Sequence, residues 1–141
     1  MPDPVERMSI EVARGRDEPG LDPRDAAALA AAWLDHNRTG RETRFWAWER
    51  VDDVIGRQPV TGWLLVRHLI AGAADEAQLG SVAAGPLEEM LSAHSAVLID
   101  RVEPAARTDP RTMRALAGVW KNAIADDDWE RIQRLLGRVP D

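Results

Sequence analysis

Apolar residues recur at three- and four-residue intervals along most of the chain, and short breaks marked by proline or glycine separate the runs. This spacing places the apolar side chains on one face of an α-helix. The pattern predicts helices over 22–39, 44–55, 58–73, 86–104, 109–124 and 126–136. Most of these segments begin with a proline at the first helical position, where its missing N–H group is not needed. Residues 75–84 are predicted to form an irregular or briefly helical connection.

The distribution of apolar residues differs from one predicted helix to the next. The 58–73 segment is apolar around most of its circumference, which is typical of a helix at the centre of a core. In 44–55, Trp48 falls on the apolar side with Ile55, and Gly56 is predicted to end the helix. The apolar stripe of the predicted helix 86–104 comprises Leu87, Met90, Leu91, His94, Val97, Leu98 and Val102. The stripe of the predicted helix 109–124 comprises Met113, Leu116, Ala117, Trp120 and Ile124.

The predicted fold is therefore all-α, since no pair of segments alternates as paired strands would. About six helices, arranged as three helical hairpins, would form an irregular helical bundle or a short HEAT-like array. The 141 residues fit one domain, which we place at 21–141. Residues 1–20 are rich in proline and charge, with Met8, Ile10 and Val12 alternating as in a short strand, and are predicted to form a tail or arm.

The sequence predicts a soluble, cytoplasmic protein of bacterial type. No apolar run approaches the length of a membrane span, and the first residues lack the features of a signal peptide. Cysteine is absent, which excludes disulfides, thiolate metal sites and a cysteine nucleophile. We expect no membrane partner.

Acidic residues dominate the middle of the chain. The net charge is −6, and no Lys or Arg occurs between Arg67 and Arg101. The acids in that interval are Asp75, Glu76, Glu88, Glu89 and Asp100. This balance argues against nucleic-acid binding, which needs a basic surface, and is compatible with a basic protein partner. The alternative is that these carboxylates only keep the domain soluble.

The glycines of 80–85 have the spacing of a phosphate-binding loop, but the lysine and hydroxyl residue that should follow are replaced by Pro86 and Leu87. Glu88 would also place a negative charge where an anion would bind. We therefore exclude a nucleotide site and expect Glu88 to cap the helix that begins at Pro86. No other pattern in the chain implies a cofactor.

His94 is the strongest candidate for chemistry. Its place on an apolar stripe predicts a buried imidazole whose nitrogens are satisfied by a backbone carbonyl, a Trp N–H or a carboxylate. The alternative is an acid–base pair with Glu88 or Asp100 in a pocket between helices. The histidines lack the three- or four-residue spacing of helical metal sites, so no metal is expected. The run Asp126 to Asp128 is predicted to cap the last helix.

Trp46 is the best candidate for contact with a partner. On a helical wheel it lies on the polar side with Glu49, Arg50 and Asp53. An indole in this position either packs against a neighbouring segment, such as the N-terminal tail, or is exposed as an anchor for a partner.

Three stretches of the sequence resemble an uncharacterised bacterial domain family. They are Ala84-Gly-Pro-Leu-Glu-Glu-Met-Leu-Ser-Ala-His94, Ile99-Asp-Arg-Val-Glu103 and Ala115-Leu-Ala-Gly-Val-Trp120. The first matches a G-P-L-E-x-x-L-x-x-H pattern, and Trp33, Trp46 and Trp63 match upstream Trp positions of the family. The resemblance implies one helical domain over about 22–135, marks Glu88 and His94, and supplies no reaction.

The leading hypothesis is a non-catalytic, acidic interaction module, in its most concrete form an immunity or antitoxin-like protein that masks a basic partner such as a nuclease toxin. Candidate contact residues are Trp46, Glu49, Asp53, Asp75, Glu76 and Glu89. A second hypothesis is a small enzyme that uses His94 with Glu88 or Asp100 as an acid–base pair. A third is a scaffold or oligomerising subunit in which residues 1–20 reach a neighbouring chain.

Overall fold

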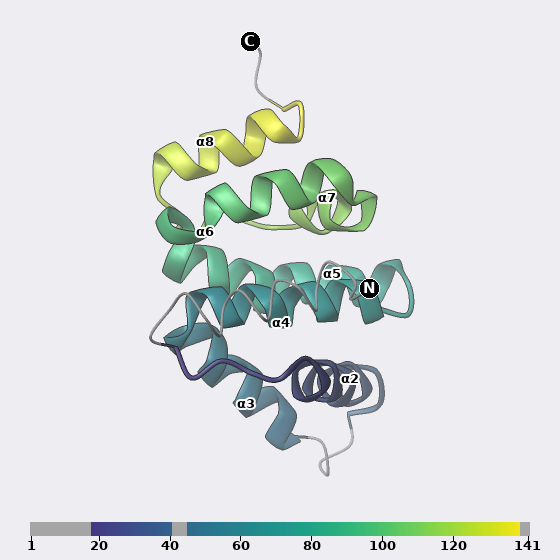
Figure 1. Ribbon diagram of the computed structural model, residues 1–141. Coiled ribbons are helices and arrows are strands. Elements are labelled where there is room, and N and C mark those ends of the chain that lie inside the picture. The colour runs from purple at the N-terminus through teal and green to yellow at the C-terminus, as the bar shows by residue number, and fades with distance from the viewer. Residues whose placement is uncertain (1–17, 41–44, 139–141) are drawn as a thin grey trace.

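The computed structural model describes residues 18–40 and 45–138, and within these ranges the backbone forms helices and connecting turns without a strand (Figure 1). The helices are α2 (Pro23–Thr39), α3 (Phe45–Arg57), α4 (Pro59–Gly72), α5 (Glu76–Val82), a π-helical turn (Ala83–Leu87), α6 (Glu88–Thr108), α7 (Pro110–Ala117) and α8 (Asp126–Leu135). The predicted all-α fold is confirmed. None of the described helices combines the length and apolar character needed to cross a membrane.

The helices stack in chain order (Figure 1). Helices α2 and α3 form one end, α4 and α5 follow, then α6 and α7, and α8 forms the other end. Helix α4 lies at the centre and contacts α2, α3, α5, α6 and α7. Its residues from Val60 to Val66 are all buried, whichever side of the helix they occupy. The predicted central position of this segment is confirmed, because its apolar residues leave no face suited to water.

Helix starts were predicted best where an aspartate precedes a proline. The Asp22 carboxylate accepts a hydrogen bond of 2.8 Å from the Arg24 N–H, and Asp109 caps α7 in the same way through Arg111. The three aspartates of α8 occupy its first turn, but none of them caps it, and the capping position is Ala125. Their charge still complements the helix dipole.

Helix α3 does not end at Gly56, as predicted, but continues to Arg57. Gly56 keeps a negative φ, and the helix is broken by Gln58, whose φ of −130° and ψ of 87° suit a residue before proline. The buried face of α3 consists of Ala47, Val51, Val54 and Ile55. Trp48 was wrongly placed on that face: it is 44% exposed, because it lies at the margin of the stripe.

The connection predicted over 75–84 is briefly helical, as one of the two expected forms, but the predicted helix start at Pro86 is wrong. Helix α5 passes through the π-helical turn directly into α6, and Pro86 lies inside that turn. In an α-helix the Pro86 ring would clash with a carbonyl of the preceding turn, and the wider π-helical spacing accommodates it. Helix α6 then continues past Pro104 to Thr108, with a kink at His94 (φ −138°, ψ 21°). Val97, predicted on the buried stripe, is exposed beyond this kink.

The predicted fifth helix is too long. Helix α7 ends at Ala117, and Gly118 follows with a φ of −94° and a ψ of 1°. Trp120, predicted on an apolar face, is 75% exposed, whereas Ile124 reaches the core from the irregular segment 118–125. The apolar residues from Met113 to Ile124 suggested one continuous helix, but only the part up to Ala117 is helical.

Residues 18–20 contact the beginning of α4. Its capping residue Gln58 makes no capping hydrogen bond. The Glu18 carboxylate instead accepts hydrogen bonds from the N–H groups of Thr61 (2.9 Å) and Val60 (3.3 Å). The Gln58 side chain in turn accepts a bond from the N–H of Gly20. A segment distant in sequence therefore caps the central helix. Residues 1–17, with the predicted strand at 8–12, lie outside the described residues.

Replacement of Glu18 by alanine is expected to lower the free energy of unfolding by about 1 kcal/mol, because it leaves two N–H groups at the positive end of α4 without an acceptor. Glu18→Gln retains an acceptor oxygen without the charge and should lie between the alanine variant and the unmodified protein. Urea unfolding followed by tryptophan fluorescence measures the difference. Equal stability of the alanine variant and the unmodified protein would contradict this assignment of the cap.

Candidate functional site

Two acidic side chains meet where α3 and α6 pack together. Glu89, in the first turn of α6, lies near the Asp52 carboxyl of α3, which contributes to raising the pKa of Glu89. Further along the same contact, Nε2 of His94 lies 3.0 Å from the backbone carbonyl oxygen of Ile55. The α3–α6 contact thus includes a polar contact to the backbone at Ile55 and the approach of two carboxyl groups.

The Asp52–Glu89 pair joins two shallow hollows on the surface. One, of about 740 Å³, is lined by Trp46, Glu49, Arg50, Asp52 and Asp53. The other, of about 500 Å³, is lined by Glu88, Glu89, Ser92, Ala93, Asn122 and Ala123. Because Asp52 belongs to the first hollow and Glu89 to the second, the two hollows adjoin. We call this surface the acidic face and define it by Glu49, Asp52, Asp53, Glu88 and Glu89.

The carboxyl groups of the acidic face differ in how readily they ionise and in whether they are paired with a base. Partial burial, together with the hydrogen bond and charge of Asp52 and the charge of Glu88, raises the pKa of Glu89 from its usual 4.5 to about 7. Asp53 is paired with two bases on its own helix, Arg57 at 2.9 Å and Arg50 at 3.4 Å. Near neutral pH the face therefore keeps a net negative charge, although Glu89 is only partly ionised.

Exposed aromatic rings border the acidic face. Trp46, which lines the first hollow, is 51% exposed. Trp120 lies beside the second hollow, where its backbone N–H donates a 2.8 Å hydrogen bond to Glu88. Elsewhere on α3, the Phe45 and Trp48 rings stack with their centroids 5.7 Å apart. Phe45 also meets the His36 ring edge-on, with the centroids 5.8 Å apart. Large exposed rings beside a shallow charged surface are a feature of protein-binding sites.

The structure brings together four of the six predicted contact residues. Trp46, Glu49 and Asp53 line one hollow and Glu89 lines the next. The other two lie elsewhere, at the start of α5. Asp75 caps that helix by accepting a bond from the Gln78 N–H, and Glu76 forms a 3.5 Å ion pair with Arg114. The acids of the middle third of the chain do not form one patch.

The three candidate catalytic side chains are bonded to different partners. His94 faces the Ile55 carbonyl and is partly buried, so it is less enclosed than predicted, although a backbone carbonyl is among its expected partners. Asp100 pairs with Arg131 at 3.0 Å. Glu88 does not cap a helix at Pro86, as predicted, because α5 continues through the π-helical turn into α6 and leaves no free helix end there. Its carboxylate instead accepts bonds from the Trp120 N–H and the Asn122 amide and fixes the 118–125 segment.

Asp52 and Trp120 belong to this site and were not among the predicted residues. Asp52 is adjacent to Asp53, and neighbouring residues on a helix point in different directions, so sequence spacing gave no sign of a carboxyl pair. Its partner Glu89 comes from another helix, and only the packing of α3 against α6 brings them together. Trp120 was assigned to a helix that ends before it.

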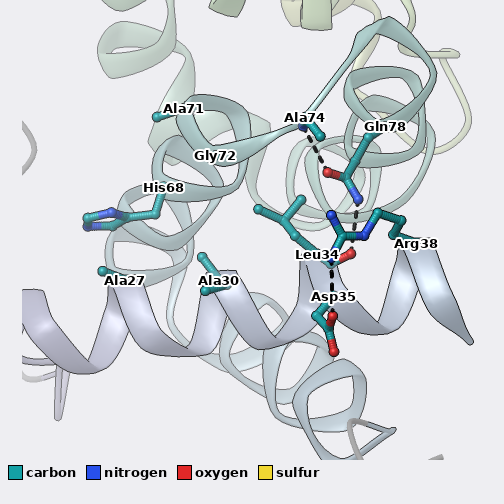
Figure 2. A pocket seen from close by; sticks show the side chains of 11 residues that line it. Ala27, Ala30, Leu34, Asp35, Arg38, His68, Ala71, Gly72, Ala74 and Gln78 are labelled. Atoms are coloured by element: carbon teal, nitrogen blue, oxygen red, sulfur yellow. Dashed lines mark hydrogen bonds and ion pairs between the residues drawn. The ribbon is translucent and has the colours of Figure 1, made fainter. Parts of the chain in front are cut away.

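Another hollow is a groove between α2 and α4, with a volume of about 450 Å³ (Figure 2). Alanines and Leu34 form most of its wall. Three of its polar side chains are bonded within the protein: Arg38 pairs with Asp35, and the Gln78 amide bonds the Leu34 carbonyl and the Ala74 N–H. Gln78 thereby ties α5 to α2. In the described part of the chain, no three His, Asp or Glu side chains gather to hold a metal ion.

The raised pKa of Glu89 predicts how stability depends on pH. Between about pH 4.5 and 7 the folded protein holds a proton on Glu89 that the unfolded chain releases, so stability falls as pH rises through this window and is level above it. Glu89→Gln replaces the protonated acid with a neutral amide. We expect the variant to match the unmodified protein at pH 5 and to exceed it by about 1 kcal/mol at pH 8, since solvent screens this exposed pair. Thermal unfolding across pH measures this difference, and equal pH profiles of the two proteins would refute it.

Comparison with known proteins identifies a family. Residues 34–139, which include the whole acidic face, match the model of a family of unknown function, DUF6869. Neither the curated proteins nor the solved structures contain a match to the chain. The expected membership of an uncharacterised family is confirmed. The chain belongs to the DUF6869 family, whose function is unknown.

Proposed function

We propose that the protein is a non-catalytic interaction module whose acidic face binds a basic protein. The observation that carries this proposal is the position of an exposed indole, Trp46, within a hollow whose other walls are mostly carboxylates. An exposed indole offers a large rigid contact surface, and its ring attracts cations. The carboxylates beside it would pair with Lys or Arg of the partner.

Charge and shape support the same conclusion. The chain carries a net charge of −6, which would steer a basic partner toward the molecule over distances longer than a contact. The two hollows of the acidic face extend over α3, the start of α6 and the segment before α8, so a partner could cover both at once. A stable complex generally buries about 800 Å² on each partner, which requires a surface of this extent.

The most specific form of the proposal is an immunity or antitoxin-like protein that masks a basic partner such as a nuclease toxin. An acidic face of this kind would occupy the cationic surface with which such a partner binds nucleic acid. The bonded positions of His94, Glu88 and Asp100 favour binding over catalysis, because each of these side chains serves a structural contact.

Two matched charge reversals test the proposal. The immobilised full-length protein should capture one stoichiometric partner from a native extract at low salt, and that partner should be basic. Glu49→Lys, on the acidic face, should weaken its binding at least tenfold, because an attractive charge becomes repulsive. Glu76→Lys makes the same change at the start of α5 and should leave the affinity unchanged. Both affinities are measured by titration with the purified partner.

The proposal fails if the captured protein is neutral or acidic, if no partner is captured, or if both variants bind equally well. Trp46→Ala provides a second check that leaves the charge unchanged. Loss of the exposed ring should weaken binding, and circular dichroism should show the same helix content as in the unmodified protein, since the indole contributes little to the core.

A further inference from the structure

We propose that residues 8–12 of the chain itself bind in the groove between α2 and α4. The groove shares no lining residue with the acidic face, so this binding does not depend on the proposed function. The occupant of the groove would then be the N-terminal segment of the same molecule, rather than a ligand or another protein.

The groove is an apolar hollow on the surface. Side chains of α2 form one side of it and side chains of α4 the other (Figure 2). Its volume of about 450 Å³ lies in the range of sites that hold a bound group. A chain segment that covers apolar groups in a hollow removes them from water, which is favourable. The exposed residues of the wall are Ala27, Ala31, Ala71, Gly72 and Ala74.

Residues 18–22 fix where the N-terminal segment joins the described structure. The Glu18 carboxylate accepts hydrogen bonds from N–H groups in the first turn of α4, and the Gly20 N–H donates to the Gln58 side chain just before that turn. Helix α2 begins at Pro23. Residues 18–22 therefore run from the start of α4 to the start of α2 and lie at one end of the seam between these helices.

The groove extends from that end along both helices. Helices α2 and α4 run in the same direction, because residues 18–22 join their starts and Gly72, at the end of α4, lies against Leu34 in the second half of α2. Helix α3 packs against both helices but contributes nothing to the lining of the groove, so the groove opens on the other side of the seam. From the first residues of α4, His68 is about 12 Å away along the helix and Gly72 about 18 Å.

The N-terminal segment is long enough to reach the groove. An extended chain advances about 3.3 Å per residue, so Val12 can lie up to about 20 Å from Glu18 and Met8 up to about 33 Å. Both limits exceed the distances along α4. Residues 8–12, when extended, span about 13 Å, and the part of α2 that lines the groove is about 17 Å long. The segment therefore fits within the length of the groove.

The sequence of this segment suits a groove with one wet side. Met8, Ile10 and Val12 alternate with Ser9 and Glu11. Since the side chains of an extended chain point alternately to opposite sides, the three apolar side chains would face the groove and the two polar ones would face water. The small alanines of the wall leave space for side chains of this size.

Disulfide trapping in the full-length protein tests the inference, because the chain has no cysteine of its own. Ile10→Cys is combined with Ala31→Cys, at an exposed position of the groove wall. The control combines Ile10→Cys with Gly56→Cys, an exposed position with open space for a side chain, two residues before Gln58. Residue 10 can reach both targets, so a segment without a preferred site would link to both at similar rates.

We expect the groove pair to form an intramolecular disulfide at least tenfold faster than the control pair, in dilute protein and the same oxidising buffer. Loss of free thiols gives the rate, and gel filtration separates monomeric from dimeric product. Similar rates for the two pairs would show that the groove is left for another ligand and would overturn the inference. A disulfide-linked dimer from the groove pair would show that the segment occupies the groove of a second copy, which would also overturn it.

A second comparison needs no cross-link. Ile10→Asp would place a charge against the alanines of the groove, so it should lower the urea concentration at the midpoint of unfolding. Ser9→Asp makes the same addition of charge on the side that faces water and should leave the midpoint unchanged. Equal midpoints for the two variants would contradict the binding of Ile10 in the groove.

Discussion

The structure depends on the burial of α4 on every side. A helix without a polar face is stable in water only if other helices surround it, and α2, α3, α5, α6 and α7 do so. Contact with α3 is close: a Cβ atom at Gly62 would lie 3.2 Å from the Ile55 Cα. At the other end of α4, Arg111 of α7 donates to the Ile70 and Ala73 carbonyls, which have no helical partner there. These contacts fix the neighbouring helices around one axis.

The acidic face follows from that arrangement. Helix α3 lies against Gly62 on one side and receives His94 of α6 at the Ile55 carbonyl on another. Two helices held in this way leave their polar edges next to each other, which brings Asp52 to Glu89. The π-helical turn before α6 contributes as well, because it carries the chain past Pro86 without a break and so sets where the first turn of α6 begins. Turns of this type are often found at functional sites.

The sequence predicts the fold well where one strong local signal acts. The Asp-Pro pairs at 22–23 and 109–110 mark helix starts that the structure confirms, and the all-round apolar character of 58–73 marks the central helix. The prediction fails where tertiary packing outweighs a local signal. A proline often begins a helix, but at Pro86 the chain is already helical and widens into a π-helical turn. Trp120 continues the apolar spacing of α7 although the helix has already ended. The candidate site is predicted only in part. Trp46, Glu49 and Asp53 share one helix, so a helical wheel finds them, whereas the Asp52–Glu89 pair depends on packing between helices.

The central claim is that the packing of α3 against α6 partly buries Glu89 beside Asp52 and so makes Glu89 harder to ionise than an ordinary glutamate. Carbon-detected NMR of the side-chain carboxyl groups across pH 3 to 9 tests this claim most directly, since each carboxyl carbon reports its own protonation. The account predicts that the Glu89 signal shifts with a midpoint near pH 7, and that Asp52→Asn moves this midpoint toward the ordinary range of a glutamate. A Glu89 midpoint near 4.5 in the unmodified protein would show that neither burial nor Asp52 hinders its ionisation and would contradict the account.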